Sequence, residues 1–259
     1  MMIDLHSHIL PGLDDGATTL EEALAIGRMA AADGIHTIAA TPHSPASIAS
    51  RRYDPTLIRE QVAALNAALA AEAIDLTVVA GTEICYDVDL VGQLRRGALL
   101  PYGASRTVLL ELPHDTLPPA IDQALFALQV AGYRVVLAHP ERIGAVQRDP
   151  NMLLPLIERG ALMQLTAEAL TGGQGQRLRA AAETLLSHGM AHLLASDAHG
   201  MPPRRPAILS AARSRATALL GPDAATTLVT TTPAAILQDA PLRLDSPRPV
   251  ARARWRLWR

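Results

Sequence analysis

The chain opens with a short apolar run that leads into two histidines and a loop: residues 3–16 read IDLHSHILPGLDDG. Alternate side chains of a strand point to the same face, so a strand ending here would place His6 and His8 side by side. The loop that follows carries Asp14 and Asp15 before a glycine, a combination that is typical of a tight turn. This stretch therefore predicts a buried strand whose end carries potential metal ligands.

The same unit, a short apolar run separated from the next by a helical pattern, recurs along the chain. Runs this short and this apolar are typical of strands that are buried on both faces. We expect strands at residues 3–5, 37–40, 76–80, 107–110, 134–138, 161–165 and 192–195. We expect helices at residues 20–32, 56–71, 119–131, 176–187 and 206–220. Alternating strands and helices indicate parallel pairing, and seven units favour a closed or nearly closed α/β barrel, with a doubly wound sheet as the alternative.

Side chains suited to metal binding come where these strands end. The carboxyl ends of parallel strands meet at one edge, where the active sites of α/β proteins assemble, so we expect these side chains to gather there. Imidazole together with carboxylate suits Zn, Mn, Fe or Ni better than Ca or Mg alone, and the number of ligands predicts two or three metals. The groups are His6, His8, His43, Glu83, Glu111, His139, Asp197 and His199, with Asp14 and Asp15 in the first loop and His114 on the same edge.

Composition excludes several kinds of chemistry. All 23 residues counted as Lys or Arg are Arg, which excludes lysine Schiff bases, phosphate-loop lysines and lysine general bases. The single cysteine, Cys85, excludes an internal disulfide framework and a cysteine zinc cluster. Residues 241–259 hold six arginines and one acid, so residues 1–240 carry a net charge of −7, which argues against a nucleic-acid partner. With no signal peptide and no long apolar stretch, we expect a cytoplasmic protein.

A change of composition divides the chain near its end. We expect residues 1–240 to form one domain and residues 241–259 to form a flexible basic tail. The tail interleaves basic and aromatic side chains: Arg252, Arg254, Trp255, Arg256, Trp258 and Arg259. Because Trp and Arg have an affinity for anionic lipid interfaces, an anionic membrane or a partner protein is one candidate contact, and a solvated terminus is the alternative.

These segments together resemble the PHP (polymerase and histidinol phosphatase) superfamily, and within it the bacterial tyrosine-phosphatase branch found with capsule and exopolysaccharide genes. The resemblance covers residues 2–239 and rests on residues 3–16 and on later motifs in the same order. Those motifs are TPH at 41–43, GTEI at 81–84, LELP at 110–113, AHPER at 138–142 and ASDAH at 195–199. The resemblance implies a distorted (β/α)7 TIM-like barrel with three divalent metals, commonly manganese, with iron, zinc, cobalt or magnesium as alternatives.

The resemblance also implies a role for each matched residue. One metal would be bound by His6, His8, Glu83 and Asp197; a second by Glu83, Glu111 and His139, with Glu83 bridging; and a third by Asp15, His43 and His199. Arg142 would hold the substrate phosphate and act in catalysis together with an arginine of the loop after His199. The family pattern of Arg before Pro favours Arg205, and Arg204 is the alternative because this loop differs from the family in length and composition. The stretch after His43 also lacks the second histidine that is usual there.

The resemblance implies a phosphoesterase that hydrolyses phosphotyrosine in proteins, with a tyrosine autokinase of capsule or exopolysaccharide synthesis as the expected partner. We hypothesise in-line attack by a metal-bridging hydroxide, without a covalent enzyme intermediate. A cysteine-dependent tyrosine phosphatase would need Arg six residues after Cys85, where Val91 stands. The alternatives are a PHP phosphatase acting on a small phosphomonoester such as histidinol phosphate, a metal-dependent amidohydrolase, which the absence of lysine disfavours, and a metal-binding regulator without activity.

Overall fold

The computed structural model describes residues 1–251. The strands in that part of the chain all pair in parallel, in a three-stranded sheet of order β1-β2-β3 and a five-stranded sheet of order β4-β5-β6-β7-β8. The strands are β1 (Met2–Ser7), β2 (Ile35–Ala40), β3 (Thr77–Ala80), β4 (Glu83–Cys85), β5 (Thr107–Glu111), β6 (Arg134–Ala138), β7 (Leu162–Thr166) and β8 (Leu193–Ala195).

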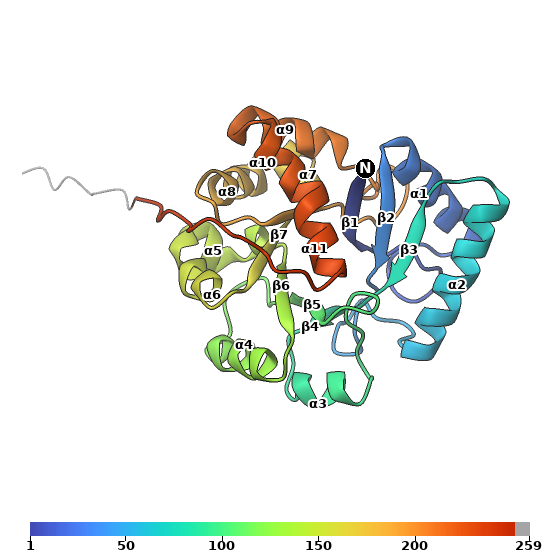
Figure 1. The fold of residues 1–259 in the computed structure, drawn as a ribbon, viewed down its shortest axis with the longest axis horizontal. Helices are drawn as coiled ribbons and strands as arrows, with labels where there is room; N and C mark the ends of the chain where they lie inside the picture. Colours follow the sequence, from blue (N-terminus) through green and yellow to red (C-terminus); the bar gives the residue numbers. More distant parts are fainter. Residues whose placement is uncertain (252–259) are drawn as a thin grey trace, which may run out of the picture.

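Helices connect the strands and surround them (Figure 1). They are α1 (Leu20–Ala32), α2 (Pro55–Ala71), α3 (Leu90–Arg95), α4 (Ile121–Val130), α5 (Gly144–Arg148), α6 (Leu154–Glu158), α7 (Ala167–Thr171), α8 (Gln176–Ser187), α9 (Ser210–Leu220), α10 (Pro222–Thr226) and α11 (Thr232–Leu237). Shorter turns are the 3-10 segments η1 (Pro140–Arg142) and η2 (Pro150–Leu153) and the π-helical segment η3 (Thr227–Thr231). Within residues 1–251, none of the helices has the length and apolar character needed to cross a membrane.

The two sheets join along both of their edges to form a distorted barrel. β3 runs on into β4 through two residues, and isolated bridges connect His43 with Glu83 and Ser7 with Ala198. Asp4 in β1 strengthens the second junction, because its carboxylate accepts the Ser196 backbone N–H at 3.0 Å and the Ser196 hydroxyl at 2.5 Å. The predicted parallel α/β fold is confirmed, and counting β3 and β4 as one interrupted unit gives the seven expected units.

The interruption after β3 is the main departure from the expected strands. The sequence pattern predicts a loop around Glu83, whereas Glu83 begins β4. The change of partner occurs at Gly81: β3 pairs with β2, and β4 pairs with β5. A Cβ atom added at Gly81 would lie 3.2 Å from Thr41 and 3.3 Å from the ring of Tyr102, so the chain is tightly enclosed at this point. Glu83 is thereby held by strand hydrogen bonds and not by a loop.

Apolar side chains fill the barrel and cover its outside. The inner cluster takes residues from almost every strand and is closed at one end by Ile236 of α11, which lies across the ring of strands (Figure 1). A larger cluster lies between the strands and the surrounding helices. The inner residues include Leu5, Ala39, Leu109, Val136, Leu162 and Leu193. A strand that is buried on both faces needs apolar residues in succession, which explains the continuous runs in the sequence.

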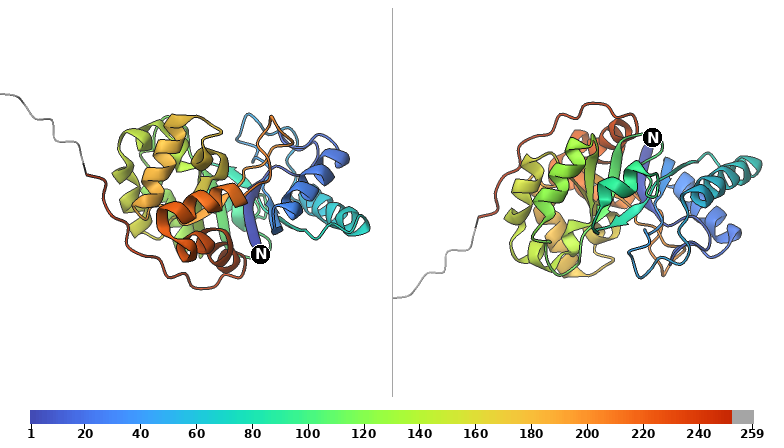
Figure 2. Two further views of the ribbon diagram at one scale, coloured as in Figure 1. Left: turned by 90° about the horizontal axis from the view of Figure 1, so that it is seen from above. Right: turned by 90° about the horizontal axis from the view of Figure 1, so that it is seen from below.

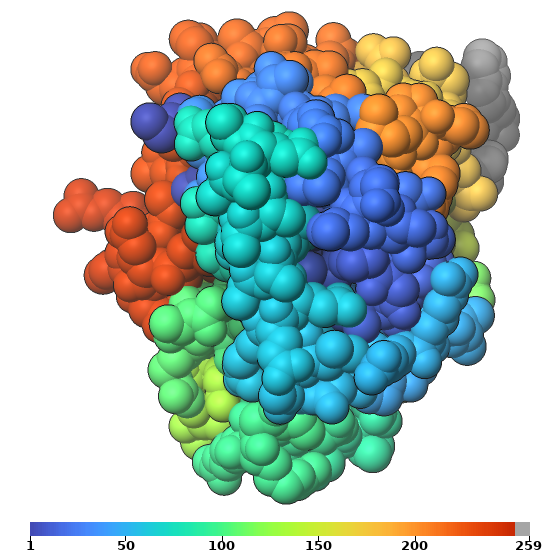
Figure 3. All heavy atoms as spheres, turned by 90° about the vertical axis from the view of Figure 1, so that its right-hand side faces the viewer, coloured from blue at the N-terminus to red at the C-terminus, as the bar shows by residue number. Residues whose placement is uncertain are grey.

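Polar side chains cap α1, α2 and α9 and help to fix where these helices begin. Asp54 accepts the backbone N–H groups at the start of α2, and Thr19 does the same for α1, which packs beside α2 on the face shown in Figure 3. The expected helices at 119–131 and 206–220 begin later, at Ile121 and Ser210. In α9 the cap comes from a distant residue, because Asp33 accepts the N–H of Leu209 at 2.6 Å and of Ser210 at 2.9 Å.

The first half of the expected tail lies against the body. The segment after α11 runs along the outside of the barrel (Figure 2), where the N–H of Arg248 donates to the carbonyl of His188 at 2.8 Å. The side chain of Asn151 pairs with the backbone of Val250 at 2.9 and 2.8 Å. Residues 248 and 250, within the segment expected to form the tail, therefore bond to the body of the protein. The predictions for the arginines and tryptophans of residues 252–259 lie outside the described residues.

Candidate metal centre

The nine residues predicted to bind metal lie together at the carboxyl ends of the strands. Eight of them are buried or largely buried, and the Asp15 side chain is 47% exposed. They are His6 and His8 at the end of β1, Asp15 in the loop after it, His43 after β2, Glu83 in β4, Glu111 at the end of β5, His139 after β6, and Asp197 and His199 after β8. Barrel closure thus brings together residues that are up to 193 positions apart in the chain.

Glu83 occupies the middle of this group. Its Oε2 atom lies 3.2 Å from His6 Nε2, 3.3 Å from His8 Nε2 and 3.0 Å from His43 Nδ1. Its Oε1 atom lies 2.8 Å from His139 Nε2. One carboxylate therefore faces four imidazoles from three strand ends, those of β1, β2 and β6, as a carboxylate shared between two cations would.

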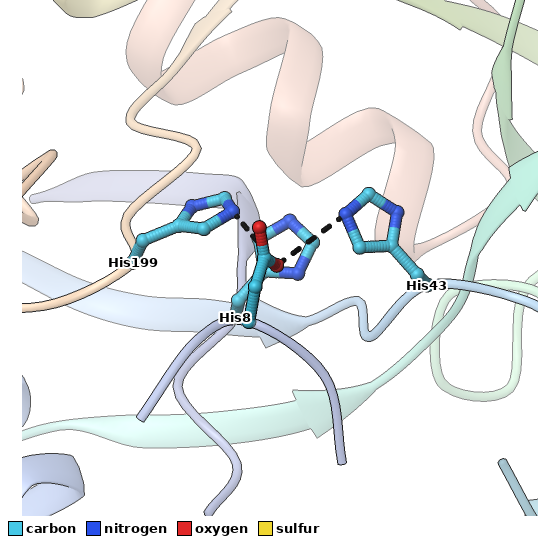
Figure 4. A group of neighbouring side chains, drawn as sticks. His8, His43 and His199 are labelled. Carbon is cyan, nitrogen blue, oxygen red and sulfur yellow. Dashed lines mark ion pairs between the residues drawn. The ribbon is translucent and has the colours of Figure 1, made fainter. Parts of the chain in front are cut away.

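Two further carboxylates extend the group on either side. Asp197 Oδ1 lies 3.4 Å from the Nε2 atoms of both His6 and His8. Asp15 Oδ1 lies 3.3 Å from His199 Nε2 and 3.6 Å from His43 Nε2. Figure 4 shows the rings of His8, His43 and His199 gathered around this point. Glu111 lies at the other end, with its Oε1 3.8 Å from His139 Nε2.

The outer nitrogen atoms of His6 and His8 are held by buried partners. His6 Nδ1 lies 2.9 Å from Gln164 Oε1, and His8 Nδ1 lies 2.7 Å from Asp14 Oδ2. Both partner oxygens are acceptors, so each imidazole carries a proton on Nδ1, and Nε2 is left as the nitrogen that would bind a metal in place of a proton. Gln164 was not predicted, because it is a lone polar residue in an apolar strand. Asp14 was predicted only as a possible metal ligand or turn residue, and it contacts His8.

The backbone of the site is under constraint. His139 and Asp197 have φ values of 33° and 54°, in the left-handed region that few non-glycine residues adopt. Gly16 is required in the first loop because a Cβ atom there would lie 2.0 Å from the carbonyl oxygen of His8. Such strain is common at functional sites, where the surrounding structure imposes the conformation.

Neighbouring charges, together with burial, set the protonation states of the site's side chains. Burial alone would raise the pKa of Glu83, but the charge of His6, the hydrogen bond with His139 and the close approach of His8 hold that pKa well below its usual range. Burial would likewise raise the pKa of Asp197, and the neighbouring Arg142 and His6 hold it well below its usual range. Burial lowers the pKa of His139, with help from the charge of Arg142. The centre therefore contains ionised carboxylates beside a neutral imidazole, the protonation states that metal binding needs.

Two of the three candidate arginines reach the centre. Arg142 and Arg205 line a cavity of about 260 Å³ over the histidines and carboxylates, and each contacts Asp197 Oδ2, at 2.6 and 3.2 Å. Arg204 turns away: its guanidinium group bonds to the backbone carbonyls of Asp15 and Gly16. Like the two arginines, His114 lines the cavity.

The donor atoms fit divalent cations. Glu83 Oε2 and His43 Nδ1 are both buried and lie 3.0 Å apart, yet within residues 1–251 neither has a hydrogen-bond partner, and buried Asp15 Oδ1 has none there either. Several sets of three or four such donor atoms lie within 4.8 Å of one another, among them His8, Asp15, His43 and His199. Buried polar atoms without partners are costly, and a cation among them would remove that cost.

A parallel α/β barrel with a centre of histidines and carboxylates at the carboxyl ends of its strands is the architecture of a metal-dependent enzyme. Residues 2–238 match the family model for capsular polysaccharide synthesis, CpsB/CapC, and the chain belongs to that family.

Similar proteins include named phosphatases. The chain is 37% identical over 203 residues to the tyrosine-protein phosphatase YwqE of Bacillus subtilis, covering 78% of this chain and 79% of that protein. It is 27% identical over 210 residues to the tyrosine-protein phosphatase CpsB of Streptococcus pneumoniae, covering 79% and 86%. A crystal structure from the study of these two proteins, described as unique metal-dependent tyrosine phosphatases, matches with a TM-score of 0.91 at 33% identity, over 97% of this chain and 100% of that one.

Proposed function

We propose that this protein is a metal-dependent phosphatase that hydrolyses phosphotyrosine in proteins. The observation that carries the proposal is the grouping of nine potential ligands around Glu83, with Arg142 and Arg205 beside the same cavity. Membership of the CpsB/CapC family and the similarity to YwqE and CpsB support this reaction class.

Three divalent metals would share the nine ligands. His6, His8, Glu83 and Asp197 would hold the first, and Glu83, Glu111 and His139 the second; Asp15, His43 and His199 would hold the third. The distances support this division. The first set lies around Glu83 and Asp197, the second around Glu83, and the third around Asp15. Manganese is the proposed metal, because mixed imidazole and carboxylate ligands suit it, as they also suit iron, zinc and cobalt.

The metals and the arginines at the cavity would have different roles in hydrolysis. When bound, the metals would polarise the phosphoryl oxygens and lower the pKa of a bound water. Arg142 and Arg205 would bind the phosphate, since a guanidinium group offers paired donors to a phosphoryl group. The leaving phenolate of tyrosine has a pKa of about 10, so it needs less protonation than an alkoxide. The chain would therefore need neither a covalent nucleophile nor a lysine.

Cys85 does not suit nucleophilic catalysis. Its thiol is half-buried, and burial together with Glu111 and Glu83 raises its pKa, which disfavours the reactive thiolate. It is also absent from the residues that line the arginine-bearing cavity. Its backbone N–H instead bonds to the hydroxyl of Ser44 at 2.9 Å, consistent with a packing role.

The proposed partner is a phosphotyrosine protein of the capsule or exopolysaccharide system, and specifically a tyrosine autokinase. The family description, capsular polysaccharide synthesis, supports the pathway. We propose that the two proteins meet in the cytoplasm.

Turnover of two phosphate esters tests the proposal. The protein loaded with manganese should hydrolyse a phosphotyrosine peptide with a kcat/KM at least about 100-fold above that for histidinol phosphate, because the two leaving groups differ in pKa. A preference for histidinol phosphate would replace the proposed substrate with a small phosphomonoester. No hydrolysis of either ester would reject the phosphatase function.

A further inference from the structure

The mouth of the metal-centre cavity carries an exposed aliphatic side chain. Ile48 is fully exposed, and it lines the cavity that also contains Arg142 and Arg205. The other side chains around this cavity are almost all histidines, carboxylates, arginines or a serine, and the apolar exceptions are Ile48 and the neighbouring Ala49. A large, exposed apolar side chain beside a polar cavity fits a ligand that is polar at one end and apolar at the other.

The loop that carries Ile48 is anchored at both ends. At its start, the N–H of Ser44 donates to the carbonyl of Glu83 at 2.9 Å, and the N–H of Ser47 donates to the carbonyl of Ser44 at 3.0 Å. At its end, the N–H groups of Arg51 and Arg52 both donate to one carbonyl in the first loop, each at 2.9 Å. These contacts tie the loop to the two segments that carry Glu83 and Asp15, so Ile48 keeps its place beside the cavity.

We propose that Ile48 is a specificity-determining contact for the aromatic ring of the substrate, an inference that rests on the proposed phosphatase function. A phosphotyrosyl side chain joins a dianionic phosphate to an apolar ring. When the phosphate lies among the arginines, the ring extends toward the mouth of the cavity, where Ile48 offers an apolar surface. An aliphatic phosphate ester, as in phosphoserine, has no ring to cover Ile48. The polar part of the cavity thus selects phosphate, and Ile48 selects aryl over alkyl esters.

Binding of two phosphonates tests this role without depending on the leaving group. Full-length protein supplied with manganese is titrated by calorimetry with phenylphosphonate and with methylphosphonate, for the unsubstituted protein and for Ile48→Ser. We expect the substitution to weaken phenylphosphonate about tenfold, as loss of an apolar contact does, and to change methylphosphonate less than about twofold. Ile48→Leu should keep both affinities, since it keeps the apolar surface.

A matched control removes a similar side chain elsewhere. Val130 is also exposed, but it lies on α4 and does not line the cavity, so Val130→Ser should leave both affinities unchanged. An equal effect of Ile48→Ser on both phosphonates, no effect on either, or no phenyl preference in the unsubstituted protein would overturn the proposal. Hydrolysis of a phosphotyrosine peptide is measured in parallel. Its absence would reject the phosphatase function, whereas hydrolysis with an unchanged phenyl preference in Ile48→Ser would reject only the role of Ile48.

Discussion

Asp14 accepts a hydrogen bond from Nδ1 of His8 over 2.7 Å, and this contact sets which nitrogen of His8 faces Glu83. The same carboxylate accepts the backbone N–H of Gly16 at 2.9 Å and of His43 at 3.1 Å. One buried residue therefore orients a proposed ligand and ties the first loop to the segment after β2.

Asp14→Asn should lower the affinity for divalent metal by about 10- to 100-fold, because the amide no longer fixes the proton of His8 on Nδ1. Competition with a fluorescent chelator measures this affinity. The control is Asp54→Asn at the exposed start of α2, which should leave metal affinity unchanged. Equal affinity in Asp14→Asn and the unsubstituted protein would show that Asp14 does not orient His8.

Arg142→Ala and Arg205→Ala should each reduce kcat/KM for a phosphotyrosine peptide by about 10- to 100-fold, since a charge-assisted hydrogen bond contributes about 1.5–3 kcal/mol. Lysine at either position should restore only part of the rate, because it lacks the planar pair of donors. Steady-state kinetics provide the measurement, with Arg59→Ala on α2 as a surface control. Unchanged kcat/KM in both variants would contradict their contact with phosphate.

Arg204→Ala should give a different pattern from Arg205→Ala. The guanidinium group of Arg204 holds the carbonyls of Asp15 and Gly16, so its loss should loosen the loop that carries a proposed ligand. We expect weaker metal binding and a lower kcat, with the inhibition constant of inorganic phosphate unchanged at saturating metal. A large rise in that inhibition constant would mean that Arg204 itself contacts phosphate.

The stability of the metal-free protein should depend on pH through His192. This side chain is buried, and burial lowers its pKa to about 4; its Nδ1 accepts the backbone N–H of Met163 at 2.9 Å. The unfolded chain takes up a proton near pH 6.5 whereas the folded chain does not, so stability should fall as the pH drops from about 6.5 to about 4, by about 3 kcal/mol in all. Urea unfolding in a chelator, from pH 7 to pH 4.5, measures this loss.

The matched variant is His192→Gln, which cannot take up the proton. Its unfolding free energy should change less over the same pH range than that of the unsubstituted protein. Parallel curves for the two proteins would show that His192 is not the titrating group.

Much of the fold could be predicted because it depends on local patterns. Each buried strand needs a continuous apolar run, and each polar residue after such a run falls at the same edge of the barrel. The split between β3 and β4 could not be predicted, because it lies in which strands they pair with, β2 for β3 and β5 for β4, and those partners come from other parts of the chain. The start of α9 depends in the same way on Asp33, a residue 176 positions from the Leu209 N–H that it accepts.

The candidate site shows the same division. The nine proposed ligands could be predicted from their positions after strands and from their motifs, whereas Gln164 and Asp14 gain their roles only from the histidines that they touch. The sequence alone does not decide whether Arg204 or Arg205 faces the cavity, because the difference lies in the hydrogen bonds of Arg204 to the carbonyls of Asp15 and Gly16. The packing of residues 241–251 depends on partners such as Asn151, far away in the sequence.

The rate of phosphotyrosine-peptide hydrolysis after exhaustive chelation, with the metal content of the same sample measured by mass spectrometry, shows whether hydrolysis depends on bound metal. If the centre around Glu83 binds the catalytic metals, the metal-free protein should retain less than about 1% of the rate, manganese should restore it, and alkylation of Cys85 should leave it unchanged. Full activity in protein that contains no metal would show that the centre around Glu83 does not hold a catalytic metal.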